Sequence, residues 1–101
     1  MNAYTKDFII PKIKAYFKTQ PIEKAWLFGS YSRGEENENS DIDILVDFRK
    51  DSHVGLFKYS GIHCDLKEIL GKEVDLVKNG TLKSFAIESA NHDKILIYER
   101  N

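Results

Sequence analysis

Apolar residues recur at helical spacing near the start of the chain. Between residues 5 and 19 they form a single stripe, made of Phe8, Ile9, Ile13, Tyr16 and Phe17. This spacing predicts an amphipathic helix whose apolar face packs on a core. Pro11 cannot donate a backbone hydrogen bond, so we expect it either to start the regular helix or to kink it.

A second helix is predicted over residues 56–70. The residues expected to contact the core are Leu66, Ile69 and Leu70. Gly61 weakens the helical pattern, and we expect a break there. Gly71 is expected to end the helix.

Four short apolar runs predict strands. They cover residues 22–28, 42–48, 73–77 and 94–98. In the second run, apolar positions alternate with Asp43 and Asp47, a period of two that is typical of a strand. We expect the last run to form an edge strand.

The order of these elements predicts the fold class. After a turn at Asn79-Gly80, a helix capped by Thr81 is expected to continue to Ala90. Helices interleaved with about four short strands indicate an α/β (α+β) fold with a small mixed β-sheet. Because no repeat, low-complexity tract or linker divides the sequence, we expect residues 1–101 to form a single domain.

The charge balance excludes one broad class of function. Fifteen basic residues against sixteen acidic residues give a formal net charge of −1. Proteins that bind nucleic acid through its phosphate backbone usually carry a basic surplus. General nucleic-acid binding is therefore not expected.

Cysteine content and hydropathy indicate the compartment. The one cysteine, Cys64, cannot form an intrachain disulfide, which fits a reducing environment. No stretch approaches the roughly 20 apolar residues that span a bilayer. We expect a soluble cytoplasmic protein without a membrane segment.

Asp41 and Asp43 are the first candidate site residues. Residues two apart in a strand point to the same face, so the two carboxylates should be neighbours. Their mutual repulsion would be relieved by a divalent cation, and Mg²⁺ prefers oxygen ligands. Carboxylates that hold two such ions can align the attacking and leaving oxygens of a phosphoryl transfer.

A phosphate-binding turn is expected just before this pair. The strand that ends at Gly29-Ser30 turns into a short helix, whose first N–H groups attract anions. Gly29 allows close approach of a ligand, and the Ser30 hydroxyl can bind a phosphate oxygen. Arg33 lies one helical turn further and can add a charge-assisted bond.

Asp75 is the candidate for a third carboxylate, since a two-metal site needs one. It is another acid within an apolar strand, between Val74 and Leu76. If its strand lies beside that of Asp41 and Asp43, the three carboxylates converge.

These residues resemble the nucleotidyltransferase superfamily of DNA polymerase beta, in particular its minimal members (MNT). The resemblance lies in Gly29-Ser30, Arg33-Gly34, Ser40-Asp41-Ile42-Asp43 and Val74-Asp75-Leu76-Val77. It implies the polymerase beta-like palm fold and a Mg²⁺-dependent enzyme that uses two ions, with Mn²⁺ as an alternative. By the same resemblance Asp41 and Asp43 hold the metals, Asp75 acts as ligand and base, and Gly29 and Ser30 bind the triphosphate.

The resemblance also implies a partner and a reaction. Minimal members are commonly encoded beside a HEPN protein, as the antitoxin of a toxin–antitoxin pair. They are thought to transfer AMP from ATP to a tyrosine of the toxin. We therefore expect a protein adenylyltransferase whose substrates are a nucleoside triphosphate and a HEPN-domain partner.

Simpler interpretations stay open for each candidate residue. Asp41, Asp43 and Asp75 can be solvated acids of edge strands. Ser30 can cap the helix that follows it. Arg33 can pair with Glu35, with Glu36 or with an aspartate of the site rather than with phosphate. Among the aromatic side chains, Tyr31 is expected to be exposed, and Trp26 and Phe28 to lie in the core.

Two other functions stay open as well. The chain can be a binding module that neutralises its partner by contact alone. Alternatively, it can modify a small molecule, as related aminoglycoside enzymes do, although those carry an additional substrate domain. Pairing of the last strand between two copies would give a homo-oligomer.

Overall fold

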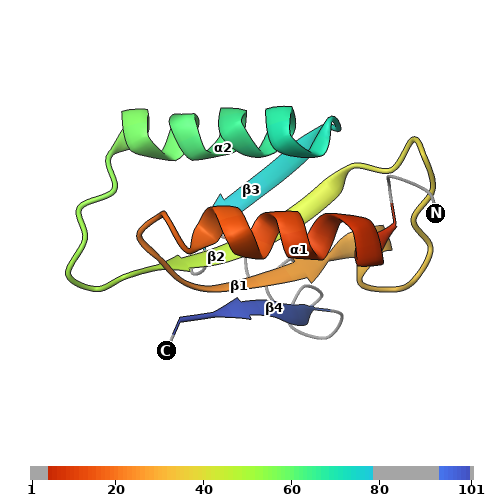
Figure 1. The fold of residues 1–101 in the computed structure, drawn as a ribbon, viewed down its shortest axis with the longest axis horizontal. Coiled ribbons are helices and arrows are strands. Elements are labelled where there is room, and N and C mark those ends of the chain that lie inside the picture. The colour runs from red at the N-terminus through yellow and green to blue at the C-terminus, as the bar shows by residue number, and fades with distance from the viewer. Residues whose placement is uncertain (1–4, 79–93, 101) are drawn as a thin grey trace.

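A four-stranded sheet carries two α-helices in the part of the chain that the structure describes (Figure 1). The structure is a computed structural model and describes residues 5–78 and 94–100. Its elements are α1 (Lys6–Phe17), β1 (Ile22–Phe28), the 3₁₀ helix η1 (Gly29–Tyr31), β2 (Ile42–Phe48), α2 (Leu56–Leu70), β3 (Val74–Lys78) and β4 (Ile95–Glu99). In these ranges, no helix is long and apolar enough to cross a membrane.

The sheet is mixed, as the sequence predicts. The strand order is β3-β2-β1-β4, with β1 antiparallel to both of its neighbours and β2 parallel to β3. A parallel pair needs a long crossover, which α2 supplies. This topology places β3 and β4 at opposite edges of the described sheet, and β4 is the edge strand that the sequence predicts.

Both helices bury their apolar stripes on the same face of the sheet. Ile9, Ile13 and Phe17 of α1 are fully buried in one cluster with alternate residues of the strands. Pro11 lies inside the helix on its exposed side, so it does not begin the helix. The hydrogen bond that Pro11 cannot make would reach the carbonyl of Asp7, an exposed residue that water can satisfy.

Two details of α2 differ from the prediction. The helix continues through Gly61 without a break, because this glycine faces open space and has no packing to disturb. Ile69 is 37% exposed and is not a core residue. The buried positions follow a spacing of four residues and are Ile62, Leu66 and Leu70. Gly71 ends the helix as predicted, with a φ of 65°.

The predicted strands are confirmed, with small shifts at the end of the chain. The first two have the predicted bounds, while β3 and β4 each begin and end one residue later than predicted. The turn at Asn79-Gly80 and the helix from Thr81 to Ala90 lie outside the described residues.

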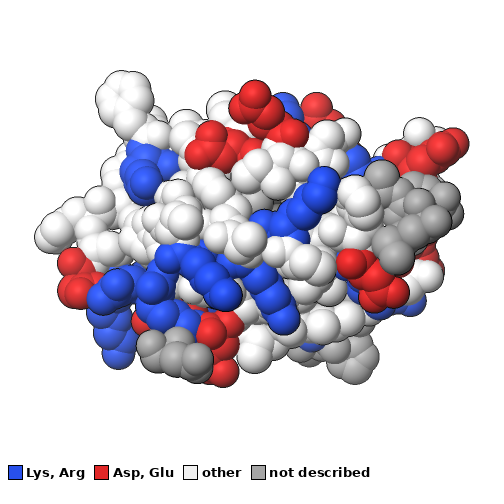
Figure 2. Space-filling view, in the orientation of Figure 1, with Lys and Arg blue, Asp and Glu red and all other residues white. Residues whose placement is uncertain are grey.

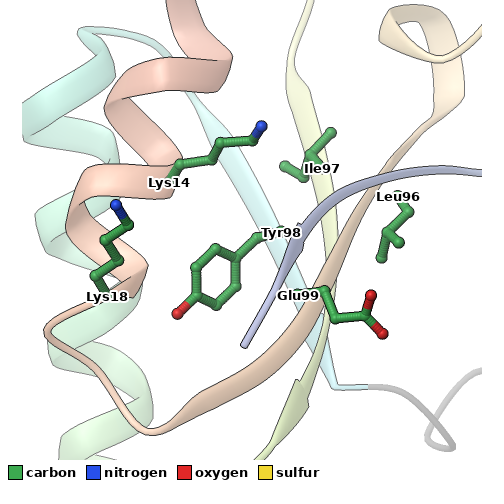
Figure 3. A pocket seen from close by; sticks show the side chains of 6 residues that line it. All are labelled: Lys14, Lys18, Leu96, Ile97, Tyr98 and Glu99. Atoms are coloured by element: carbon green, nitrogen blue, oxygen red, sulfur yellow. The ribbon is translucent and has the colours of Figure 1, made fainter. Parts of the chain in front are cut away.

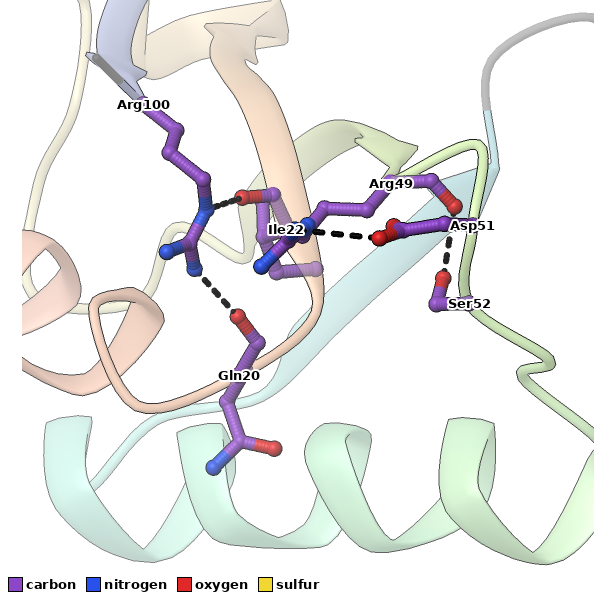
Figure 4. Close-up of polar contacts among 6 residues, drawn as sticks. All are labelled: Gln20, Ile22, Arg49, Asp51, Ser52 and Arg100. Carbon is purple, nitrogen blue, oxygen red and sulfur yellow. Dashed lines mark hydrogen bonds and ion pairs between the residues drawn. The ribbon is translucent and has the colours of Figure 1, made fainter.

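Arg100 links the end of β4 to the connection between α1 and β1 through hydrogen bonds (Figure 4). Its Nε donates to the carbonyl of Ile22 at 3.0 Å and its Nη2 to that of Gln20 at 2.6 Å. The neighbouring Arg49 pairs with Asp51 at 3.1 Å. These contacts fix the end of the sheet where β1 begins.

The outer edge of β3 is covered by two side chains of α2. The hydroxyl of Tyr59 donates to the carbonyl of Leu76, and Nε2 of His63 hydrogen-bonds the carbonyl of Val74. An edge strand would otherwise leave these carbonyls without partners in the sheet. The two contacts lie on either side of Asp75 and hold its segment of β3 against the helix.

Candidate active site

The sheet brings Asp43 and Asp75 side by side. In the register of the strands, Asp43 of β2 pairs with Asp75 of β3 on one side and with Phe28 of β1 on the other. Ile42 and Ile44 point into the core, so Asp43 between them points to the opposite face, away from the helices. The sequence left open whether these two strands are neighbours, and the structure places them side by side. Asp41 lies just before β2 and is exposed.

Gly29 is packed against the Asp43 carboxylate. It follows β1, opens η1 and has a φ of 72°, a conformation that favours glycine. A Cβ at this position would lie 2.3 Å from Oδ2 of Asp43. No side chain can occupy that space without displacing the carboxylate. The chain thus needs glycine here to bring the turn and the acid together.

The turn after Gly29 is closed by its own backbone. The carbonyl of Gly29 accepts hydrogen bonds from the N–H groups of Ser32 and Arg33, at 3.1 and 3.3 Å, and from the Ser32 hydroxyl at 2.8 Å. The N-cap residue of η1 is Phe28, and the structure has no side-chain hydrogen bond at this cap, so Ser30 does not cap the helix. Ser30 lies half-buried beside Gly29.

Arg33 faces two acidic groups. Its Nε donates to Oε1 of Glu35 at 2.6 Å, which is one of the pairings considered from the sequence. Its positive charge also lowers the pKa of Asp43. Both members of the Arg33–Glu35 pair are exposed, and pairs of this kind contribute little to stability. Arg33 therefore lies close enough to act electrostatically on the carboxylates.

Asp43 holds its proton unusually tightly. The pKa of Asp43 is raised from 3.8 to about 7. Burial is the largest cause, followed by a hydrogen bond with Asp75 and by the negative charges of Asp75 and Asp41. The positive charge of Arg33 only partly opposes these effects. The charges around Asp43 are therefore mostly negative, with Arg33 as the opposing positive group.

The carboxylates of Asp41, Asp43 and Asp75 are of the chemical type that binds a divalent cation. Asp43 and Asp75 are in contact, and Asp41 acts on Asp43 through its charge. Within residues 5–78 and 94–100, no group of three or more His, Cys, Asp or Glu side chains is arranged to hold a metal ion. The structure thus brings two of the three predicted carboxylates together, in a place where a cation would relieve the repulsion that raises the pKa of Asp43.

Three aromatic residues near the site are not placed as predicted. Tyr31 is fully buried rather than exposed, because η1 turns its ring into the core cluster. Trp26 and Phe28 are half-buried and lie outside that cluster. Their neighbours in β1, Ala25 and Leu27, are the residues that face the helices.

The sequence offered little signal for the two residues that hold β3. Tyr59 and His63 are four residues apart on α2, so they share one helix face. No motif in the sequence includes Tyr59, and His63 lacks the spacing of a metal ligand and is expected to be a structural or surface residue. Only the position of β3 next to α2 shows that they reach the backbone beside Asp75.

The sequence is similar to those of known nucleotidyltransferases. The family described as polymerase beta, nucleotidyltransferase matches residues 11–101. A protein of Methanocaldococcus jannaschii, provisionally named a protein adenylyltransferase, is 34% identical over 91 residues, which cover 88% of this chain and 91% of the relative. The protein adenylyltransferase MntA of Thermococcus cleftensis is 44% identical over 63 residues, or 62% of each chain.

Solved structures share the fold. One described provisionally as a minimal nucleotidyltransferase has a TM-score of 0.70 at 27% identity, covering 85% of this chain and 86% of that one. A toxin–antitoxin crystal structure with AMP-PNP has a TM-score of 0.75 at 23% identity, covering 91% and 74%. The complex of a tri-AMPylated HEPN toxin of Shewanella oneidensis with its MNT antitoxin has a TM-score of 0.70 at 20% identity, covering 93% and 72%.

Proposed function

Because the chain belongs to the polymerase beta nucleotidyltransferase family, we propose that it transfers AMP from ATP to a tyrosine of a HEPN-domain toxin and thereby acts as the antitoxin. The observation that carries this proposal is the contact between Asp43 and Asp75 directly beside the Gly29 turn. The relatives named protein adenylyltransferases support AMP as the transferred group. The fold shared with an MNT antitoxin bound to an AMPylated HEPN toxin supports the partner.

The metal ligands in this proposal are Asp41, Asp43 and Asp75. Together they would hold two Mg²⁺ ions, with Mn²⁺ as a substitute, through carboxylate oxygens. Bound ions supply positive charge that stabilises the triphosphate and aligns the attacking and leaving oxygens. Among the three ligands, Asp43 should bind the cation most strongly. Burial and its acidic neighbours destabilise its negative charge, and a bound cation would offset this destabilisation.

The triphosphate is assigned to the turn after β1. The start of a helix presents backbone N–H groups that can donate to phosphate oxygens, and η1 begins in this turn at Gly29. The Ser30 hydroxyl adds a further donor, and Gly29 keeps the backbone close to Asp43. Arg33 exchanges its exposed contact with Glu35 for a charge-assisted bond to phosphate.

Asp75 is the proposed base. It is exposed on the edge strand β3, where the hydroxyl of a partner's tyrosine can reach it. It accepts the tyrosine proton while the phenolic oxygen forms a bond to the α-phosphorus. The bond from that phosphorus to the bridging oxygen of the β-phosphate breaks, and pyrophosphate leaves with the electron pair.

Mass spectrometry of the partner tests the reaction. The protein is incubated with Mg²⁺, ATP and the HEPN-domain protein encoded by a neighbouring gene, and the partner's peptides are mapped. We expect AMP on one or more tyrosines, and no adduct after Tyr→Phe substitution at the mapped sites. Parallel reactions with GTP, CTP and UTP test the choice of base, and ATP should give the largest yield. An unmodified partner in a stable complex would instead identify a binding module.

A further inference from the structure

A groove between α1 and β4 lies away from the Asp43–Asp75 pair (Figure 3). It has a volume of about 410 Å³ and is lined by Lys14, Lys18, Leu96, Ile97, Tyr98 and Glu99. Figure 3 shows the two lysines extending from the helix along one side, with the Tyr98 ring between the helix and the strand. The groove therefore combines basic groups from α1 with the backbone and apolar side chains of β4.

The charge of this groove is positive. Lys14 and Lys18 are four residues apart, are exposed and share one face of α1. Neither forms an ion pair with another residue of the described chain, whereas Glu99 is paired with Lys24 at 3.2 Å. Figure 2 shows Lys and Arg side chains gathered in its lower left part, over the end of α1 and of the sheet, with a few acidic side chains beside them.

The strand beside the lysines is open to further pairing. Among the strands that the structure describes, β4 pairs with β1 alone, and none of them pairs with its outer edge. An edge of this kind presents backbone N–H and C=O groups to a further strand. Two of its apolar side chains are also exposed, Ile95 by 37% and Leu96 by 49%. Exposed apolar residues on a free strand edge are typical of a surface that binds another chain.

We propose that this groove binds an extended acidic segment of a partner protein, which adds to β4 as a further strand. The segment's backbone pairs with the free edge of β4. Its acidic side chains face Lys14 and Lys18, and its alternate apolar side chains cover Leu96.

The same charges argue against a second copy of this chain as the occupant. Pairing of β4 with β4 around a two-fold axis would place α1 of both copies on the same face of the joined sheet. Lys14 and Lys18 would then face their own copies across the junction, and like charges placed together oppose association. An acidic partner removes this repulsion.

Binding of designed peptides to the whole protein tests the proposal by fluorescence anisotropy. The probe is a short labelled peptide of alternating Glu and Val. One control peptide has Lys in place of Glu. Another has Pro at two consecutive central positions, which removes one backbone N–H from each edge of the peptide strand, and carries one extra terminal Glu to keep the charge. We expect the acidic peptide to bind, the basic peptide not to bind, and the proline peptide to bind at least about tenfold more weakly.

Variants of the groove give the second arm. The double substitution Lys14→Glu with Lys18→Glu should lower the binding affinity for the acidic peptide by about tenfold or more. Its matched control, Lys50→Glu with Lys58→Glu, makes the same change in net charge at exposed positions outside the groove and should bind as the wild type does. Thermal unfolding verifies that both double variants are folded. The milder variant Lys14→Gln with Lys18→Gln, which removes the positive charges without adding negative ones, repeats the binding test.

Several results would overturn the proposal. The proposal fails if the acidic peptide does not bind. It also fails if the groove variants bind the acidic peptide as well as the wild type does, or if the proline peptide binds as tightly as the acidic peptide. A dimer in light scattering that persists in the Lys14→Glu, Lys18→Glu variant would assign the edge to a second copy. Displacement of the peptide by single-stranded RNA at equal concentration would assign the basic surface to nucleic acid.

Discussion

Gly29 and Asp43 constrain each other at the centre of the proposed site. The glycine adopts a φ of 72°, and the missing Cβ is what admits the Asp43 carboxylate. The sequence motif predicts that a glycine and an acid lie close to a shared ligand. It does not predict that they contact each other, because that contact depends on the pairing of Phe28 with Asp43 between two strands.

Gly29→Ala should impair both stability and transfer. Gly34 provides the matched control, since it has a nearly equal φ of 73° but open space where a Cβ would be. Gly34→Ala should lower the free energy of unfolding by only about 1 kcal/mol, the cost of placing alanine in the left-handed backbone conformation. Gly29→Ala should cost about 1–3 kcal/mol more in urea unfolding, because the new methyl displaces the carboxylate. Equal losses for the two variants would show that the contact with Asp43 has no consequence.

The pH dependence of stability reports on Asp43. In metal-free buffer the native carboxyl keeps a proton that the unfolded chain releases, so the free energy of unfolding should fall as pH rises from 3.8 to about 7. Asp43→Asn should flatten this fall relative to the wild type. Saturating Mg²⁺ should also oppose it in the wild type, since the cation replaces the proton, but not in the variant.

Asp47→Asn is the control for this measurement, because Asp47 lies on the same strand and face and pairs with Lys24 in β1. It should leave the fall in stability in place. Identical pH profiles for the wild type and Asp43→Asn would contradict the raised pKa of Asp43.

At the scale of elements, the position of β3 decides whether the acids converge. The alternation of apolar residues predicts the strands, and their bounds are confirmed to within a residue. Parallel pairing of β2 with β3 joins segments separated by α2, and local patterns carry no information on that register. The same limit explains Tyr31, whose burial depends on the path of η1 and not on its neighbours in sequence.

Removing the Tyr59 hydroxyl should disturb β3. Tyr59→Phe loses the hydrogen bond to the Leu76 carbonyl, and the free energy of unfolding should fall by about 1 kcal/mol. AMP transfer should fall under conditions where the variant remains folded, because β3 carries Asp75. Tyr16→Phe is the control, since it removes a hydroxyl that bonds Asp65 on the surface at 2.5 Å. If both variants transfer AMP at the wild-type rate, the contact to β3 has no role in placing Asp75.

Across the whole molecule, the sheet order separates two surfaces. The edge strand β3 carries Asp75, while the opposite edge strand β4 borders the basic groove. If both proposals hold, a partner bound at the β4 edge would present its acceptor to the opposite edge. Composition indicates only the near-neutral net charge, and the folded chain is needed to show that basic side chains gather at one end of the molecule (Figure 2).

Transfer of label from ATP labelled at the α-phosphate tests the central claim most directly. The partner protein, Mg²⁺ and ATP are combined with the wild type, Asp43→Asn or Asp47→Asn, and label on the partner is followed over time. We predict equal rates for the wild type and Asp47→Asn, and a loss of about a hundredfold or more for Asp43→Asn. Label transfer at the wild-type rate by a folded Asp43→Asn protein would contradict the assignment of this site.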